Sequence, residues 1–187
     1  MRYVSIDIET TGLNPERDQI LEFGAVIGDT NKKYDIQSAI KFHKIILHRR
    51  IVGDIFAVNM NKDIIQEIKE AFDEPELNSK FCSIQYLEEN FIEWLKQNGF
   101  DTTKNINAAG KNFAGFDQKF LEPYFKNIKF SQRVLDPAIL YFDSNDKRLP
   151  DLKTCKARAG LNDNVSHRAL DDALDVVLLL QKKLNSD

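Results

Sequence analysis

Cysteine, net positive charge and long apolar runs are all scarce in this sequence. The 187 residues include only two cysteines, Cys82 and Cys155, which lie far apart and lack metal-ligand spacing. This pattern favours free thiols in a reducing compartment and argues against a structural zinc site. No apolar run approaches the ~18–20 residues needed to cross a bilayer, and the first residues become charged too early for a signal peptide. We therefore expect a soluble, cytoplasmic protein that does not enter a membrane.

The charge balance bears on the size of any nucleic-acid contact. Lys and Arg total 26 against 29 Asp and Glu, which gives a net charge of −3. A protein that coats long stretches of duplex would carry more positive charge. Clusters of acidic residues that bind metal ions lower the net charge without preventing contact with nucleic acid, because the ions restore positive charge locally. The composition thus favours a small footprint, such as a strand end.

The order of the predicted elements indicates one mixed α/β domain over residues 1–187. Residues 2–9 alternate and are rich in β-branched side chains, and further strands are predicted over 19–28 and 36–47. No helical pattern separates these three, so we expect them to pair antiparallel. Helical periodicity follows over 61–71, 83–98, 115–125, 149–159 and 168–185, with a short strand at 105–109 and a strand or turn near 133–136. Strands followed by alternating helices and strands predict a three-layer α/β/α fold.

Two carboxylates close the first predicted strand. Asp7 and Glu9 are two residues apart, so they share one face, while Ile6 and Ile8 point to the other. Adjacent carboxylates repel each other and raise each other's proton affinity unless a cation lies between them. An exposed face of an edge strand is the alternative interpretation. The turn that follows includes Gly12, which lets the backbone approach a ligand closely and so favours a site.

A third carboxylate lies on the predicted helix 115–125. Asp117, Phe120, Leu121 and Tyr124 follow an i, i+3, i+4, i+7 stripe. A carboxylate in line with large apolar groups faces the interior or a cleft, where it needs a compensating partner. The alternative is an aspartate in the first helical turn, favoured there by the helix dipole.

The last predicted helix carries two adjacent aspartates with different surroundings. On a helical wheel, Asp172 continues the apolar stripe of Val176, whereas Asp171 and Asp175 share one sector with Arg168. We therefore interpret Asp172 as a buried ligand and the other three as a solvated face.

His167 completes a set of five ionisable residues in three separate segments. Alone, it would be interpreted as a surface histidine, but it lies five residues before Asp172 at a helix entrance. Four carboxylates and one imidazole are what a two-metal phosphodiester hydrolase requires: oxygen ligands for hard cations and a group that takes a proton from the attacking water. The set predicts a nuclease.

Three motifs resemble those of the DnaQ-like, or DEDDh, 3′–5′ exonuclease superfamily. They are Asp-x-Glu-Thr-Thr-Gly-Leu from Asp7, Phe-Asp-x-x-Phe-Leu around Asp117, and His-x-Ala-x-x-Asp-Ala from His167. They occur in the family's order and span nearly the whole chain. The resemblance implies an RNase H-like fold, metal ligation by Asp7, Glu9, Asp117 and Asp172, and His167 as general base. It also implies that the turn of Thr10, Thr11, Gly12 and Leu13 holds the terminal nucleotide.

The second motif departs from the pattern of many relatives, His-Asn-Ala-x-Phe-Asp. Asn112 occupies the position of the usual His, and Phe113 replaces the usual Asn, so both are candidates for contacts that set the substrate preference. Phe113 and Phe116 are also candidates for stacking on bases, with core packing expected for Phe116. The basic segment 43–50 is either a phosphate-contacting flap or a solvated loop. Asp136 stands where many relatives have an acidic residue, and we interpret it as a loop cap rather than a metal ligand.

We therefore predict a 3′–5′ exonuclease that acts on single-stranded 3′ ends with two Mg²⁺ or Mn²⁺ ions about 3.5–4 Å apart. DNA is favoured over RNA because the Glu-Thr-Thr-Gly-Leu turn lacks the Met of the typical oligoribonuclease pattern. The alternative is an RNA-directed relative similar to oligoribonuclease or RNase T. A non-catalytic nucleic-acid-binding subunit is the third interpretation, and the presence of all five site residues argues against it. The sequence decides neither homodimer formation nor association with a polymerase.

Overall fold

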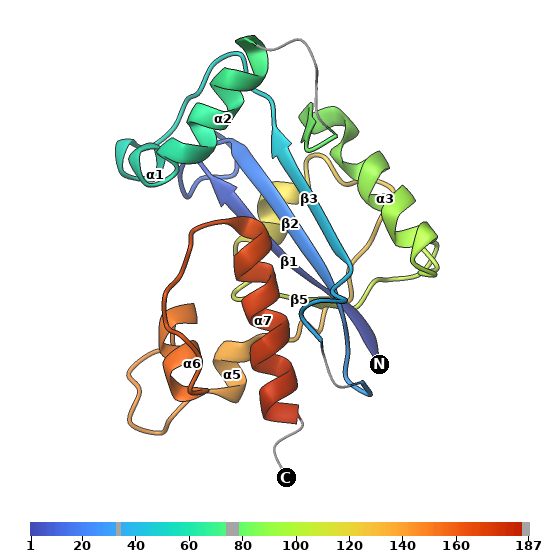
Figure 1. The fold of residues 1–187 in the computed structure, drawn as a ribbon, viewed down its shortest axis with the longest axis vertical. Helices are drawn as coiled ribbons and strands as arrows, with labels where there is room; N and C mark the ends of the chain where they lie inside the picture. Colours follow the sequence, from blue (N-terminus) through green and yellow to red (C-terminus); the bar gives the residue numbers. More distant parts are fainter. Residues whose placement is uncertain (33–34, 74–78, 185–187) are drawn as a thin grey trace.

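A single mixed sheet of five strands, in the order β4-β3-β2-β1-β5, organises the chain (Figure 1). The computed structural model describes residues 1–32, 35–73 and 79–184. The strands are β1 (Arg2–Thr10), β2 (Ile20–Asp29), β3 (Lys41–Ile46), β4 (Phe81–Cys82) and β5 (Ala108–Ala109). The first three pair antiparallel, and β4 and β5 add parallel to the two edges. The predicted antiparallel order is confirmed, although β3 begins five residues later than predicted and β4 was not predicted.

Seven α-helices connect and cover the strands in the described part of the chain. They are α1 (Ile55–Met60), α2 (Lys62–Asp73), α3 (Leu87–Gln97), α4 (Asp117–Leu121), α5 (Pro137–Leu140), α6 (Leu152–Arg158) and α7 (Ala169–Leu184). The helix predicted over 115–125 is shorter because Pro123 cannot continue it. The last residue of the helix predicted over 168–185 lies outside the described residues. Near 133–136, Leu135 makes a single bridge to Ala109 rather than a strand.

Two short helices were missed although each has a clear start signal. Asp54 caps α1 by accepting a hydrogen bond from the Phe56 N–H at 2.9 Å, and Asp136 caps α5 by accepting from the Ala138 N–H at 2.8 Å. Aspartate is among the preferred N-cap residues, and a proline at the first helical position, as in α5, is pre-organised for a helix. Both helices are too short to show a periodic apolar pattern.

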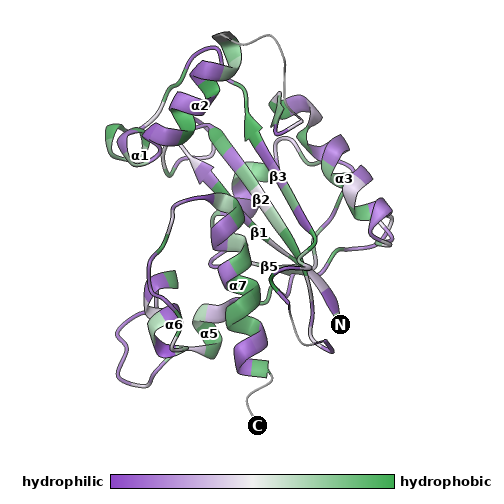
Figure 2. Cartoon of the chain, viewed as in Figure 1, coloured by the Kyte–Doolittle hydropathy of each residue, from purple (hydrophilic) through white to green (hydrophobic). Residues whose placement is uncertain are grey.

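Alternation along β1 divides the interior between the two faces of the sheet. Val4, Ile6 and Ile8 belong to a core that includes Phe91 of α3 and Phe120 of α4. On the other face, Tyr3 packs with residues of α7, whose middle is hydrophobic while its ends carry hydrophilic residues (Figure 2). The structure is thus α/β with three layers, as predicted. Residues of odd number in β1 face α7, so Asp7 and Glu9 point toward the start of that helix.

The two cysteines, Cys82 and Cys155, are both free thiols, as predicted. Among the helices of the described residues, none combines the length and the apolar character needed to span a bilayer.

Candidate active site

Side chains from three elements converge where the first strand ends. Asp7 and Glu9 come from β1, Asp172 from the first turn of α7 and Asp117 from the start of α4. Glu9, Asp117 and Asp172 are buried, with relative exposures of 7%, 2% and 7%. The wheel prediction is confirmed in this respect, because Asp172 is buried while Asp171 is exposed.

The pKa values of these carboxylates are raised by burial first and by repulsion from neighbouring carboxylates second. Burial, followed by repulsion from Asp117, Asp172 and Glu9, raises the pKa of Asp7 well above its ordinary value. Burial and the charge of Asp172 raise the pKa of Glu9 to about 8. Burial raises the pKa of Asp117 and of Asp172 to about 7 each. Such a group of like charges resists ionisation unless positive charge lies among them.

The hydrogen bonding of Asp117 and Asp172 leaves capacity for a cation. Asp117 accepts one bond, from the Ile8 N–H at 3.0 Å, which fixes its orientation beside β1. Oδ1 of Asp172 is buried without any hydrogen-bond partner. A buried acceptor without a donor is costly and rare, and carboxylate oxygens are the ligands that hard divalent cations prefer. The residues present therefore fit a divalent metal site.

His167 lies at the rim of the carboxylate cluster. A nitrogen of its ring and one carboxylate oxygen each from Glu9 and Asp172 all lie within 4.8 Å of one another. The residue is exposed, and its backbone has a φ of 52°, a left-handed conformation that non-glycine residues rarely adopt. Such backbone conformations cluster at functional sites, where the surrounding structure maintains them.

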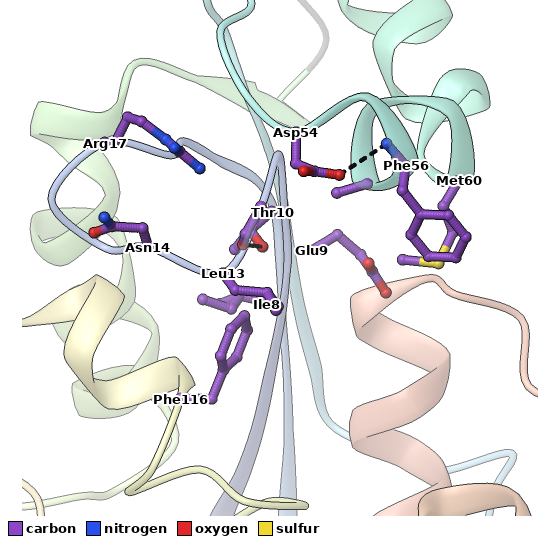
Figure 3. A pocket seen from close by; sticks show the side chains of 12 residues that line it. Ile8, Glu9, Thr10, Leu13, Asn14, Arg17, Asp54, Phe56, Met60 and Phe116 are labelled. Carbon is purple, nitrogen blue, oxygen red and sulfur yellow. Dashed lines mark hydrogen bonds between the residues drawn. The ribbon is translucent and has the colours of Figure 1, made fainter.

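A cavity of about 570 Å³ opens next to Glu9. Its wall includes Leu13 and Phe116 on one side and Phe56 and Met60 of α1 on the other, with Glu9 between them (Figure 3). Leu13 and Phe56 are 83% and 75% exposed, although both are large apolar residues. The cavity volume lies within the range of ~300–1,000 Å³ that is usual for small-molecule sites. The combination offers apolar surfaces beside a group of metal-binding carboxylates.

The turn after β1 is held by its own side chains. Thr10 Oγ1 donates to the Gly12 carbonyl at 2.6 Å, and Thr11 Oγ1 donates to the Val52 carbonyl at 2.6 Å. Thr11 is fully buried and does not line the cavity, so its side chain supports the turn instead of facing a substrate. Thr10, Gly12 and Leu13 do line the cavity, and Leu13 extends farthest into the open.

The candidate contacts from the second motif differ from expectation. Phe113 is fully buried with its ring edge against Phe130, so it offers no face to a base. Phe116 packs against the core beside Phe120, as expected, and its half-buried side chain also forms part of the cavity wall. Asn112 is exposed but does not line this cavity; its N–H donates to Asp136 Oδ2 at 2.9 Å. That bond and the cap on α5 agree with the loop-capping interpretation of Asp136.

The side chains of the basic segment 43–50 differ in their contacts. His43 Nε2 lies 2.7 Å from Glu22 Oε1, and His48 Nε2 lies 2.7 Å from the Ile20 carbonyl, so both imidazoles have partners within the protein. Arg49 and Arg50 are exposed. The imidazoles of this segment are therefore structural.

The cavity wall formed by α1 was not predicted from the sequence. Phe56 and Met60 lie between the predicted strand 36–47 and the predicted helix 61–71, where no element was expected. The available signal was Asp54, a good N-cap residue followed at once by four apolar residues.

Comparison with known proteins agrees with this geometry. Residues 4–180 match the family model RNase_T, described as exonuclease. The chain is 29% identical over 174 residues to a PolC-type DNA polymerase III of Thermotoga petrophila, covering 91% of this chain and 11% of that protein. It is 26% identical over 176 residues to an oligoribonuclease of Yersinia pseudotuberculosis, covering 92% of this chain and 87% of that protein.

A solved structure shares the fold. The nuclease domain of 3′hExo, a DEDDh family member bound to rAMP, has a TM-score of 0.68 and 16% identity, covering 96% of this chain and 90% of that chain. The family match covers most of the sequence, so this chain belongs to the exonuclease family. The chain spans only about a tenth of the polymerase it matches, but most of the oligoribonuclease. The predictions of an RNase H-like fold and of membership in an exonuclease family are confirmed.

Proposed function

We propose that this protein is a metal-dependent 3′–5′ exonuclease that removes nucleotides from single-stranded ends, with DNA as the favoured substrate. The proposal is supported by four carboxylates with raised pKa values, of which Asp7 is repelled by the other three and Asp172 has a buried oxygen without a partner. Such a cluster is unstable when charged and becomes favourable around divalent cations.

Asp7, Glu9, Asp117 and Asp172 are the residues that would hold two Mg²⁺ or Mn²⁺ ions. When bound, such cations acidify water and neutralise the scissile phosphate and the leaving oxygen. His167 lies at the exposed rim of the cluster, beside Glu9 and Asp172, where it can take the proton of the attacking water. Its exposure allows the proton to pass on to solvent.

The cavity supports a role in holding the end of a strand. Gly12 lines the cavity, and the packing of the turn requires a glycine there, because a Cβ would lie 2.1 Å from Asp18 Oδ2. Leu13 and Phe116 on one wall and Phe56 on the other present apolar surfaces between which a base can insert. Stacking on such side chains tolerates any base, which fits an enzyme that must accept each new terminal nucleotide in turn.

Two observations bear on the preference between DNA and RNA. The turn sequence Glu9–Leu13 favours DNA, and the PolC-type relative is named as a DNA polymerase. The match to an oligoribonuclease along nearly its whole length supports RNA oligomers as a second candidate substrate. Either substrate would present the same phosphodiester to the carboxylates, so the choice depends on the walls of the cavity.

The test uses oligonucleotides labelled at the 5′ end: single-stranded DNA, single-stranded RNA and RNA dinucleotides, each with Mg²⁺ or EDTA. We expect ladders that shorten from the 3′ end, need the divalent ion and run faster on DNA. Asp7→Asn should abolish the ladder. Faster hydrolysis of RNA dinucleotides would reverse the substrate preference, and no metal-dependent hydrolysis of any of them would contradict the proposal.

A further inference from the structure

Glu22 is a fifth carboxylate beside the site, and it is fully paired. It lies on β2 directly opposite Glu9 in the β1–β2 register, so both side chains point to the same face of the sheet. Its side chain has no exposed surface. Oε1 accepts hydrogen bonds from Arg168 Nη2 at 2.6 Å and Nε at 2.9 Å, and Oε2 accepts from the Ala169 N–H at 2.8 Å. These donors, together with His43, lower the pKa of Glu22 despite its burial.

The helical wheel placed Arg168 on a solvated face, and this prediction is wrong. The side chain of Arg168 instead anchors its segment to neighbouring carboxylates. Its Nη1 donates to Glu67 Oε1 of α2 at 2.8 Å, so each of its three nitrogens donates to a carboxylate. The side chain is 29% exposed. An arginine with all three nitrogens engaged in this way is better suited to holding neighbouring chain segments together than to capturing a phosphate.

The backbone around His167 is held on both sides. After it, Arg168 and the Ala169 N–H attach the chain to Glu22 on β2. Before it, Lys156 donates to the Asn164 carbonyl and forms an ion pair with Asp175. The left-handed φ of His167 costs free energy and persists only where the surroundings impose it.

The close packing of α7 on the sheet also restrains the backbone next to His167. A Cβ added at Gly24 of β2 would lie 2.3 Å from the backbone C of Ala169 and the N of Leu170. The first turn of α7 thus rests directly on the strand that carries Glu22. The contacts leave little freedom for the residues that immediately follow His167.

We propose that Arg168, fixed by Glu22, is a positioning residue that holds the imidazole of His167 beside Glu9 and Asp172. This inference rests on the proposed function, in which His167 takes the proton of the attacking water. Displacement of a reacting group by about 1 Å can cost 10²-fold in rate. Loss of the guanidinium should therefore lower kcat through His167, with little effect on the binding of the strand end in the cavity.

The experiment is a double-mutant cycle with Arg168→Met in the wild-type and His167→Ala backgrounds, measured with single-stranded DNA and Mg²⁺. In the wild-type background we expect kcat to fall at least ~10-fold while KM stays within ~3-fold. In the His167→Ala background the same substitution should change kcat less than ~2-fold, because the group it positions is absent. Arg168→Lys keeps the charge but loses the planar fork, and we expect an intermediate kcat.

Arg158→Met is the matched control. Arg158 makes a two-pronged ion pair with Asp146 at 2.5 and 2.6 Å and is 33% exposed, close to the exposure of Arg168, but it lies on α6 away from His167. We expect kcat of this variant to equal that of the wild type. Circular dichroism establishes that each variant is folded; where Arg168→Met is not, Arg168→Lys takes its place in the cycle.

Two results would overturn the inference. One is an equal loss of kcat from the Arg168 substitution in both backgrounds, which would mean that it acts independently of His167. The other is a rise in KM with kcat unchanged, which would make Arg168 a substrate-binding residue. An inactive wild-type protein would instead contradict the proposed function itself, so the two failures are distinguishable.

Discussion

Replacing Asp172 with asparagine should stabilise the metal-free protein while it abolishes turnover. The carboxylate is buried, and burial together with the neighbouring carboxylates raises its pKa from 3.8 to about 7. A raised pKa in the folded state means that the folded protein binds the proton more tightly than the unfolded chain does. The free energy of unfolding therefore falls as the pH rises from about 4 through about 7, and the loss is complete above that range.

The size of the expected stabilisation follows from the shift in the pKa of Asp172. About three pKa units correspond to about 4 kcal/mol, which is a ceiling because the charge is shared among coupled carboxylates. We expect Asp172→Asn to gain about 2 kcal/mol at pH 8 in EDTA, or about 4–8 °C in Tm for a domain of this size. Near pH 4, where Asp172 is protonated in the wild type, the two proteins should melt together.

Thermal melts followed by circular dichroism at pH 4 and pH 8, with EDTA or excess Mg²⁺, measure this directly. Mg²⁺ should raise the Tm of the wild type at pH 8 and should have little effect on Asp172→Asn. Asp171→Asn, at the exposed neighbouring position, is the control and should melt like the wild type. A lower Tm for Asp172→Asn in EDTA at pH 8, or equal Mg²⁺ stabilisation of both proteins, would refute the reasoning.

Three further predictions address the site and its surroundings. His167→Ala should retain the fold and the affinity for Mg²⁺ by calorimetry but lose kcat by ~10²-fold or more; full activity would exclude His167 from the mechanism. Phe113→Ala should lose about 3–5 kcal/mol in urea unfolding because the ring is fully buried, whereas Phe116→Ala should mainly raise KM; an unchanged KM would exclude its ring from strand-end binding. Asp7→Asn should abolish hydrolysis while Asp171→Asn leaves it intact; an inactive Asp171→Asn would show that the helical wheel was misread, and an active Asp7→Asn would exclude Asp7 from metal binding.

The parts of this structure that follow a strict period could be predicted from the sequence. Alternation along β1 correctly separated Asp7 and Glu9 from Ile6 and Ile8, and helical periodicity correctly separated Asp172 from Asp171. In both cases one residue type and its spacing decide which side of an element is buried. The order of the three motifs predicted the fold as well, because they resemble a known family.

Features that depend on contacts between distant segments could not be predicted in this way. Arg168 is polar and falls in the polar sector of the predicted helix, so nothing local reveals that it donates to Glu22, 146 residues away. Phe113 and Phe116 are three residues apart in an irregular segment, where no period indicates which ring is buried. The short helix α1 likewise forms a wall of the cavity only because the turn after β1 lies against it.

Anomalous X-ray diffraction from crystals soaked with Mn²⁺ and a nucleoside monophosphate tests the central claim most directly. The account predicts two anomalous peaks about 3.5–4 Å apart, enclosed by Asp7, Glu9, Asp117 and Asp172, with His167 at the open side. Peaks located elsewhere, or well-ordered nucleotide in the cavity with no ion among these carboxylates, would contradict it.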